Sequence, residues 1–175
     1  MGNALYSAVG DDGAMKIPAI TIYQPWAQLA AVGEKGIETR SWPTSHRGVI
    51  AIHAAKRHDG LLWSMYNHPV FKPLLEAHDY GEGFSSLPFG QVVAVAELIG
   101  CLKVTKYNQP KPPELTLGDY GIGRYMWVFG KVIEVKPCIE ATGRQGLWMW
   151  RVPAELEATV KTLAPWGGLM RQGIG

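Results

Sequence analysis

The segment that most constrains how this chain can fold is residues 91–104. They read QVVAVAELIGCLKV, an apolar run with the carboxylate of Glu97 in its middle. Successive side chains of a strand point to opposite faces, so a strand that is apolar at odd and even positions belongs inside a sheet. Residues 48–55 (GVIAIHAA) share this character, with His53 as their polar exception. The sequence therefore predicts two central strands.

Shorter elements surround these two strands. Runs of β-branched or alternating residues predict further strands at residues 19–23, 37–42 and 147–152, and a pair of strands at 124–130 and 131–140. Helix-forming runs bounded by Gly or Pro predict helices at residues 25–32, 61–67, 70–79 and 154–163. Helices and strands do not alternate regularly. An α+β fold, a small mixed β-barrel with flanking short helices, is therefore favoured over a parallel sheet.

The length of the chain fits one domain. It has 175 residues, of which 47% are hydrophobic, and this is enough apolar material for a single globular core. We expect residues 17–152 to form this domain and residues 153–175 to be a C-terminal helix and tail packed on it. Residues 1–16 differ in character and precede the first strand, so we expect a leader or a flexible N-terminal arm there.

Charge and cysteine content narrow the functional classes. The net charge of +2 does not by itself indicate a nucleic-acid-binding protein, and the eight Lys or Arg in residues 101–151 are either a modest basic face or a solvated surface. Cys101 and Cys138 lie far apart without metal-ligand spacing, so we expect no metal, no disulfide, no cofactor and a cytoplasmic location. No apolar run reaches the roughly 20 residues of a membrane span, and no signal peptide is apparent.

The charged residues with the clearest chemical potential are Lys35, Glu38 and Arg40. Residues 37–42 alternate, so Glu38 and Arg40 share a face with Trp42. Arg40 could bind a phosphate and Glu38 could accept protons from a base edge, or the three charges could be a surface ion-pair cluster. Glu97 interrupts an apolar strand, where a carboxylate is either a general acid or base or part of a structural salt bridge.

Aromatic and amide side chains lie close to this group in the sequence. Trp26 and Trp42 are either core residues or platforms on which a base could stack. Gln24 precedes a predicted helix and could read a base edge, while Arg47 could meet a phosphate. His53 is either a core residue hydrogen-bonded to the backbone or part of the same site. These residues together predict a nucleotide-binding site.

Several segments, in the same order, resemble the ASCH domain family, named for homology to the activating signal cointegrator and part of the PUA-like superfamily of small β-barrels. The resemblance covers most of residues 17–152. The segments that carry it are Tyr-Gln-Pro-Trp-Ala (23–27), Gly-Glu-Lys-Gly-Ile-Glu-Thr-Arg-Ser-Trp-Pro (33–43), Arg-Gly (47–48), Ile-His-Ala-Ala (52–55), residues 91–101, Gly-Asp-Tyr (118–120) and Arg-Tyr-Met-Trp (124–127). The resemblance implies binding of RNA or DNA in a cleft beside the barrel, with Lys35, Glu38 and Arg40 in that cleft.

The resemblance also implies two kinds of catalysis. Some small bacterial members of the family are amidohydrolases that remove the acyl group of N4-acetylcytidine with a lysine, a threonine and a glutamate, and another member is a ribonuclease. Lys35 and Glu97 match the lysine and the glutamate. Glu38 stands at the position of the threonine, and a carboxylate cannot serve as the same hydroxyl nucleophile.

We therefore expect the chain to bind nucleic acid, single-stranded RNA before DNA, or a free or modified nucleoside or nucleotide. The binding residues would be Gln24, Trp26, Lys35, Glu38, Arg40, Trp42, Arg47 and His53. The alternative is a metal-independent hydrolase, an amidohydrolase or a ribonuclease, with Lys35, Glu38 and Glu97 as catalytic residues. The sequence leaves open whether the protein is an enzyme.

Overall fold

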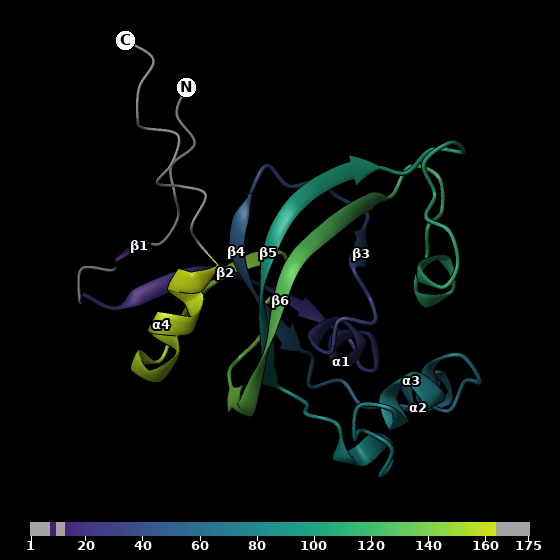
Figure 1. The fold of residues 1–175 in the computed structure, drawn as a ribbon, viewed down its shortest axis with the longest axis horizontal. Helices are drawn as coiled ribbons and strands as arrows, with labels where there is room; N and C mark the ends of the chain where they lie inside the picture. Colours follow the sequence, from purple (N-terminus) through teal and green to yellow (C-terminus); the bar gives the residue numbers. More distant parts are fainter. Residues whose placement is uncertain (1–7, 10–12, 164–175) are drawn as a thin grey trace.

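The computed structural model describes residues 8–9 and 13–163 and is built around one mixed sheet of seven strands (Figure 1). The strands are β1 (Ala8–Val9), β2 (Met15–Ile22), β3 (Ile37–Arg40), β4 (Gly48–Ala54), β5 (Gln91–Lys103), β6 (Tyr125–Glu140) and β7 (Leu147–Arg151). Hydrogen-bonded neighbours follow the order β1-β2-β4-β5-β6-β3, and β7 pairs with β2 outside this path. β2 and β4 are parallel, and the other pairs are antiparallel.

The two predicted central strands are β4 and β5, and both lie inside the sheet. Their side chains alternate between two apolar layers, with Ala96 and Leu98 of β5 in one layer and Val95 in the other. Figure 1 shows α1 and α4 on opposite sides of the sheet, where each covers one of these layers. Both faces of the central strands are therefore buried, which explains why their sequences are apolar throughout.

The helices are short. The α-helices are α1 (Trp26–Ala31), α2 (Gly60–Tyr66), α3 (Phe71–Glu76) and α4 (Ala154–Thr162), and two 3₁₀ turns are η1 (Phe84–Ser86) and η2 (Glu114–Leu117). Leu62 of α2, Leu75 of α3 and Phe84 of η1 pack with Leu29 of α1 in a separate apolar cluster. The segment between β4 and β5 is thus attached to the sheet through α1.

The α+β class is confirmed, but the sheet is not closed into a barrel. Within the described residues β3 pairs only with β6, and no backbone ladder joins β3 to β2 or β7. The side chain of Arg40 spans this gap, because its Nη2 donates a hydrogen bond to the carbonyl of Thr21 on β2. An opening therefore remains between β2 and β3.

The predicted pair of strands at 124–130 and 131–140 is wrong, because both segments belong to the single strand β6. Gly130 is not a turn here but part of an irregular stretch where the β5–β6 register shifts on both sides of Leu98. A Cβ at Gly130 would lie 3.0 Å from Glu97 Oε2 and 2.9 Å from Ile99 Cγ2. A side chain at residue 130 would therefore meet the side chains of Glu97 and Ile99 at this bulge.

The ends of the domain differ slightly from the prediction. β2 begins at Met15 and pairs with β1, so part of the predicted N-terminal arm belongs to the sheet. Val160 of α4 lies in the same apolar cluster as Trp150 of β7. Residues 1–7 and 10–12 of the predicted arm, and the tail 164–175, lie outside the described residues. None of the helices in the described ranges has the length and apolar character that a membrane crossing requires.

Candidate functional site

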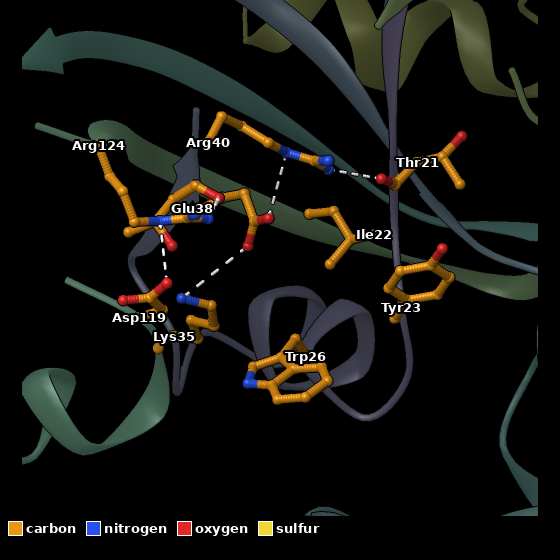
Figure 2. A pocket seen from close by; sticks show the side chains of 11 residues that line it. Thr21, Ile22, Tyr23, Trp26, Lys35, Glu38, Arg40, Asp119 and Arg124 are labelled. Atoms are coloured by element: carbon orange, nitrogen blue, oxygen red, sulfur yellow. Dashed lines mark hydrogen bonds and ion pairs between the residues drawn. The ribbon is translucent and has the colours of Figure 1, made fainter. Parts of the chain in front are cut away.

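A cavity of about 380 Å³ lies at the opening between β2 and β3, and we call it the Lys35 cavity. It combines the end of β2, the start of α1, the strand β3 and the loop before β6 (Figure 2). Its lining residues are Thr21, Ile22, Tyr23, Trp26, Lys35, Glu38, Thr39, Arg40, Gly118, Asp119 and Arg124. The predicted group of Lys35, Glu38 and Arg40 therefore lines one cavity, together with Trp26.

Lys35 is the most buried charged group of this cavity, with only 1% of its side chain exposed. Its Nζ donates a hydrogen bond to the carbonyl of Ile37 and lies 4.0 Å from Glu38 Oε2 and 3.8 Å from Glu114 Oε1. Burial lowers the pKa of the Lys35 amine, and the carboxylates of Glu38 and Glu114 oppose this shift only in part. Lys35 is thus held in place and is easier to deprotonate than an exposed lysine.

Glu114 of η2 contacts Lys35 from the loop between β5 and β6. It accepts hydrogen bonds from the Tyr120 hydroxyl and, at 2.8 Å, from the backbone N–H of Gly36. Burial, followed by the hydrogen bond to Glu114, raises the pKa of Tyr120, which keeps the hydroxyl protonated as a donor. The loop that contains η2 is therefore connected to the turn before β3 by two polar contacts of Glu114, with Gly36 and with Lys35.

Two arginines complete the charged part of the cavity. Arg40 Nε lies 3.3 Å from Glu38 Oε1, and Arg124 Nε lies 3.3 Å from Asp119 Oδ2. Arg124 also donates from Nη2 to the carbonyl of Thr39 at 3.1 Å. In Figure 2 both guanidinium groups lie between a carboxylate and a backbone carbonyl, so they can also meet a ligand with their free N–H groups.

Flat rings border the same cavity. Tyr23 is 46% exposed, and Trp26 is partly buried with its ring edge against Phe71 at a centroid distance of 5.9 Å. The guanidinium of Arg57 lies 5.3 Å from the centre of the Tyr23 ring. Because one ring is exposed and the other is fixed by packing, they offer surfaces on which a planar ligand can stack.

Trp42 and His53 lie not in the Lys35 cavity but in a neighbouring cavity, described below. Arg47 is exposed and lines neither cavity; its Nη1 donates to the carbonyls of Thr44 and His46 at 3.1 and 2.7 Å. The structure therefore divides the predicted binding residues between two neighbouring cavities and leaves Arg47 outside both.

Gln24 does not face either cavity, contrary to the prediction that it reads a base edge. Its side chain is fully buried, Nε2 donates to the carbonyl of Pro88 at 2.8 Å, and Oε1 accepts from the backbone N–H of Gln28 at 3.0 Å. Both halves of the amide are therefore used inside the protein, where they attach α1 to the loop before β5.

Glu97 lies away from Lys35. It is paired in register with Val49 of β4, which packs in the layer covered by α4, whereas the Lys35 cavity lies on the side of α1. Glu97 is also only partly buried and does not line the cavity. The structure therefore does not bring Glu97 together with the other two predicted catalytic residues.

Four polar residues of the site had no role assigned from the sequence. These are Glu114, Asp119, Tyr120 and Arg124, all of which come from the loop between β5 and β6. Three of them fall in the segments 118–120 and 124–127 that carry the family resemblance, so that signal was present. Glu114 has no such signal, because it meets Lys35 only through the folded arrangement of the loop.

The model of a family described as ASCH domain matches residues 20–139. Because this range is most of the chain and contains every residue of the Lys35 cavity, the chain belongs to the ASCH domain family. The Activating signal cointegrator 1 proteins of Homo sapiens and Mus musculus are each 30% identical to it over 93 residues, 53% of this chain. The matched region spans only 16% of the length of these relatives.

Solved structures give a more distant likeness. The crystal structure of ASCH from Zymomonas mobilis has 14% sequence identity and a TM-score of 0.47, covering 83% of this chain and 94% of that chain.

Proposed function

We propose that this ASCH domain binds a nucleotide of single-stranded RNA at the Lys35 cavity. The observation that carries the proposal is the combination of stacking rings, carboxylate acceptors and cations around one cavity of about 380 Å³. This volume falls within the roughly 300–1,000 Å³ range of small-molecule sites. Single-stranded RNA fits better than a duplex, because its bases can leave the strand and enter a pocket.

Each part of the cavity has a chemical role in this proposal. The rings of Tyr23 and Trp26 stack on the base, and Glu38 accepts hydrogen bonds from its amino or imino groups. Arg40 and Arg124 have N–H groups for the sugar or phosphate oxygens. The carboxylates also leave the cavity far from uniformly positive, which favours a ligand that has donors as well as negative charge.

Removal of the exposed ring tests the proposal. Tyr23→Ala should weaken the binding of a fluorescently labelled single-stranded RNA by about fivefold to 150-fold, since stacking contributes about 1–3 kcal/mol per base. Tyr107 is 85% exposed and lies outside the cavity, so Tyr107→Ala is the matched control and should bind as wild type does. Equal affinities of the two variants would contradict the proposal. Single-stranded DNA and free nucleosides, titrated in parallel, identify the preferred ligand.

A hydrolase is the second candidate, and it is favoured by the state of Lys35. An amine whose pKa is lowered by burial can accept a proton, and the hydroxyl-bearing Thr39 lines the same cavity as Lys35 and Glu38. The substrate would be an N4-acylated cytidine or an RNA phosphodiester. Glu97 is left out of this proposal, because it lies on the other face of the sheet.

Chromatography separates the two candidates. N4-acetylcytidine or RNA would be incubated with wild-type protein and with Lys35→Met, after both are shown by circular dichroism to be folded. Product formed by the wild type and not by Lys35→Met would support a hydrolase. If the wild type releases no product but binds RNA, catalysis is excluded for these substrates and the binding proposal stands.

A further inference from the structure

A second cavity adjoins the Lys35 cavity, and we call it the Arg144 cavity. Its volume is about 570 Å³, and it shares Thr21, Tyr23 and Arg40 with the Lys35 cavity. The remaining lining residues come from the end of β4 and the residues after it, from the loop between β6 and β7, and from Trp42 after β3. Part of this loop, residues 142–146, lies beyond the range matched by the family model. The two cavities therefore adjoin at these three shared residues, and we call the pair of cavities the cleft.

The two cavities differ in charge. The Lys35 cavity has three cations, but it also has the carboxylates of Glu38 and Asp119. The Arg144 cavity has the cations Arg40, Lys56 and Arg144 and no carboxylate among its twelve lining residues. Lys56 and Arg144 are exposed and take part in no ion pair within residues 13–163. The Arg144 cavity is thus the compartment of the cleft that favours an anion.

The loop that presents Arg144 is fixed to β2 through Thr21. The Thr21 hydroxyl donates to the carbonyl of Arg144 at 3.1 Å and accepts from Trp148 Nε1 at 3.2 Å. The carbonyl of the same threonine accepts from Arg40. Thr21 therefore holds both Arg40 and the backbone of Arg144, and both arginines are lining residues of the same cavity.

The lining of the Arg144 cavity includes a glycine, Gly143, that lies close to two other lining residues. A Cβ at Gly143 would lie 2.4 Å from His53 Cε1, 2.6 Å from His53 Nδ1 and 2.9 Å from Thr21 Oγ1. His53 is 1% exposed, and its Nδ1 has no hydrogen-bond partner among residues 13–163. The loop backbone therefore lies close to this buried ring, and a side chain at residue 143 would collide with it.

We propose that the Arg144 cavity is a phosphate subsite. It takes a phosphate of the nucleotide whose base occupies the Lys35 cavity, so this inference rests on the proposed function. Lys56 and Arg144 bind the phosphate oxygens from the outer side and Arg40 from the side shared with the base. The phosphate is either a phosphodiester of the RNA chain or the terminal phosphate of a free nucleotide.

The test removes the two exposed cations, singly and together. Lys56→Gln and Arg144→Gln should each weaken binding of a single-stranded RNA hexamer about fivefold, the upper value for an exposed charge pair. In the double variant the slope of log affinity against log salt should fall by about 0.7. Lys131→Gln removes the same charge from an exposed residue outside both cavities and should leave affinity and slope unchanged.

Two further ligands distinguish the source of the phosphate. Cytidine should bind equally well to the wild type and the double variant, because it has no phosphate. If the double variant loses affinity for 5′-cytidine monophosphate but not for a hexamer without terminal phosphates, the subsite takes a terminal phosphate. The reverse result assigns it to the phosphodiester, and either result supports the subsite.

The outcomes that overturn the subsite differ from those that overturn the proposed function. If RNA binds but Lys56→Gln, Arg144→Gln and Lys131→Gln each weaken it equally, only net charge matters and the subsite is refuted while RNA binding stands. If wild-type protein binds neither RNA nor any of the nucleotides, the proposed function fails and the subsite fails with it.

Discussion

Replacement of Gly143 by alanine should destabilise the fold by about 1–3 kcal/mol, the usual cost of overpacking. Gly143 is not among the glycines with positive φ, so alanine meets no backbone strain and the effect is steric. The three atoms nearest to its new Cβ lie at 2.4, 2.6 and 2.9 Å, all below normal contact distance. They belong to His53 and Thr21, so the cost depends on whether these two side chains can move.

Neither side chain is free to move. The His53 ring is buried, its Nε2 donates to the carbonyl of Ala141 at 3.0 Å, and it packs edge-on against Trp148 at 5.6 Å. The Thr21 hydroxyl is fixed by its hydrogen bonds to the same tryptophan and to the backbone of Arg144. Relief of the clash therefore requires displacement of the loop, and RNA binding should weaken along with stability.

Urea denaturation measures the free energy of unfolding of Gly143→Ala. The matched control is Gly60→Ala, because a Cβ at the first residue of α2 meets no atom within 4 Å. This control should be unchanged or more stable by up to about 1 kcal/mol, since alanine favours a helix over glycine. If Gly143→Ala is as stable as the control and binds RNA normally, the inferred closeness of the loop to β4 is wrong.

Three further changes test other parts of the structure. Burial lowers the pKa of His53 below its ordinary 6.5, so just below pH 6.5 the unfolded chain binds more protons than the folded protein. The free energy of unfolding should therefore decrease as the pH is lowered from 7.5 to 5.5. Calorimetry over this range should find a smaller decrease for His53→Gln than for the wild type. Tyr80 donates a hydrogen bond to the carboxylate of Glu134, so Tyr80→Phe should be less stable by about 1–2 kcal/mol in urea denaturation. The control Tyr107→Phe, at an exposed ring, should change stability by less than about 0.5 kcal/mol. Glu97→Gln should change the affinity for the labelled single-stranded RNA by less than about twofold, because the carboxylate lies on the face of the sheet opposite the Lys35 cavity.

The elements that the sequence predicts well are those whose pattern is local. The two central strands are apolar on both faces and agree with β4 and β5 to within about one residue at each end. Lys35, Glu38 and Arg40 lie within six residues of one another, so a turn followed by a strand suffices to bring them to one cavity. In both cases the interactions that decide the structure lie close together in the chain.

The elements that the sequence does not predict depend on distant partners. Glu114 reaches Gly36 across 78 positions of sequence, and no periodicity encodes such a contact. Gln24 has a side-chain amide that could read a base edge, but this amide is hydrogen-bonded to the backbone of Pro88 and Gln28. Gly130 is a residue type typical of turns, but it lies inside the continuous strand β6, where the register with β5 shifts. Residue type alone therefore cannot separate a ligand-binding role from a structural role at these positions.

The failure of the sheet to close accounts for the position of the site. Pairing of β2 with β7 ends at Ile20, so the carbonyl of Thr21 lies one residue beyond the last pair of that ladder. An unpaired strand edge needs a donor, and Arg40 of β3 supplies it with a side chain instead of a backbone N–H. A backbone ladder would bring the two strands to about 4.8 Å, whereas a guanidinium spans a wider gap. This wider gap holds the two cavities on either side of Arg40, so the arginine that completes the sheet edge is also the residue that both compartments share.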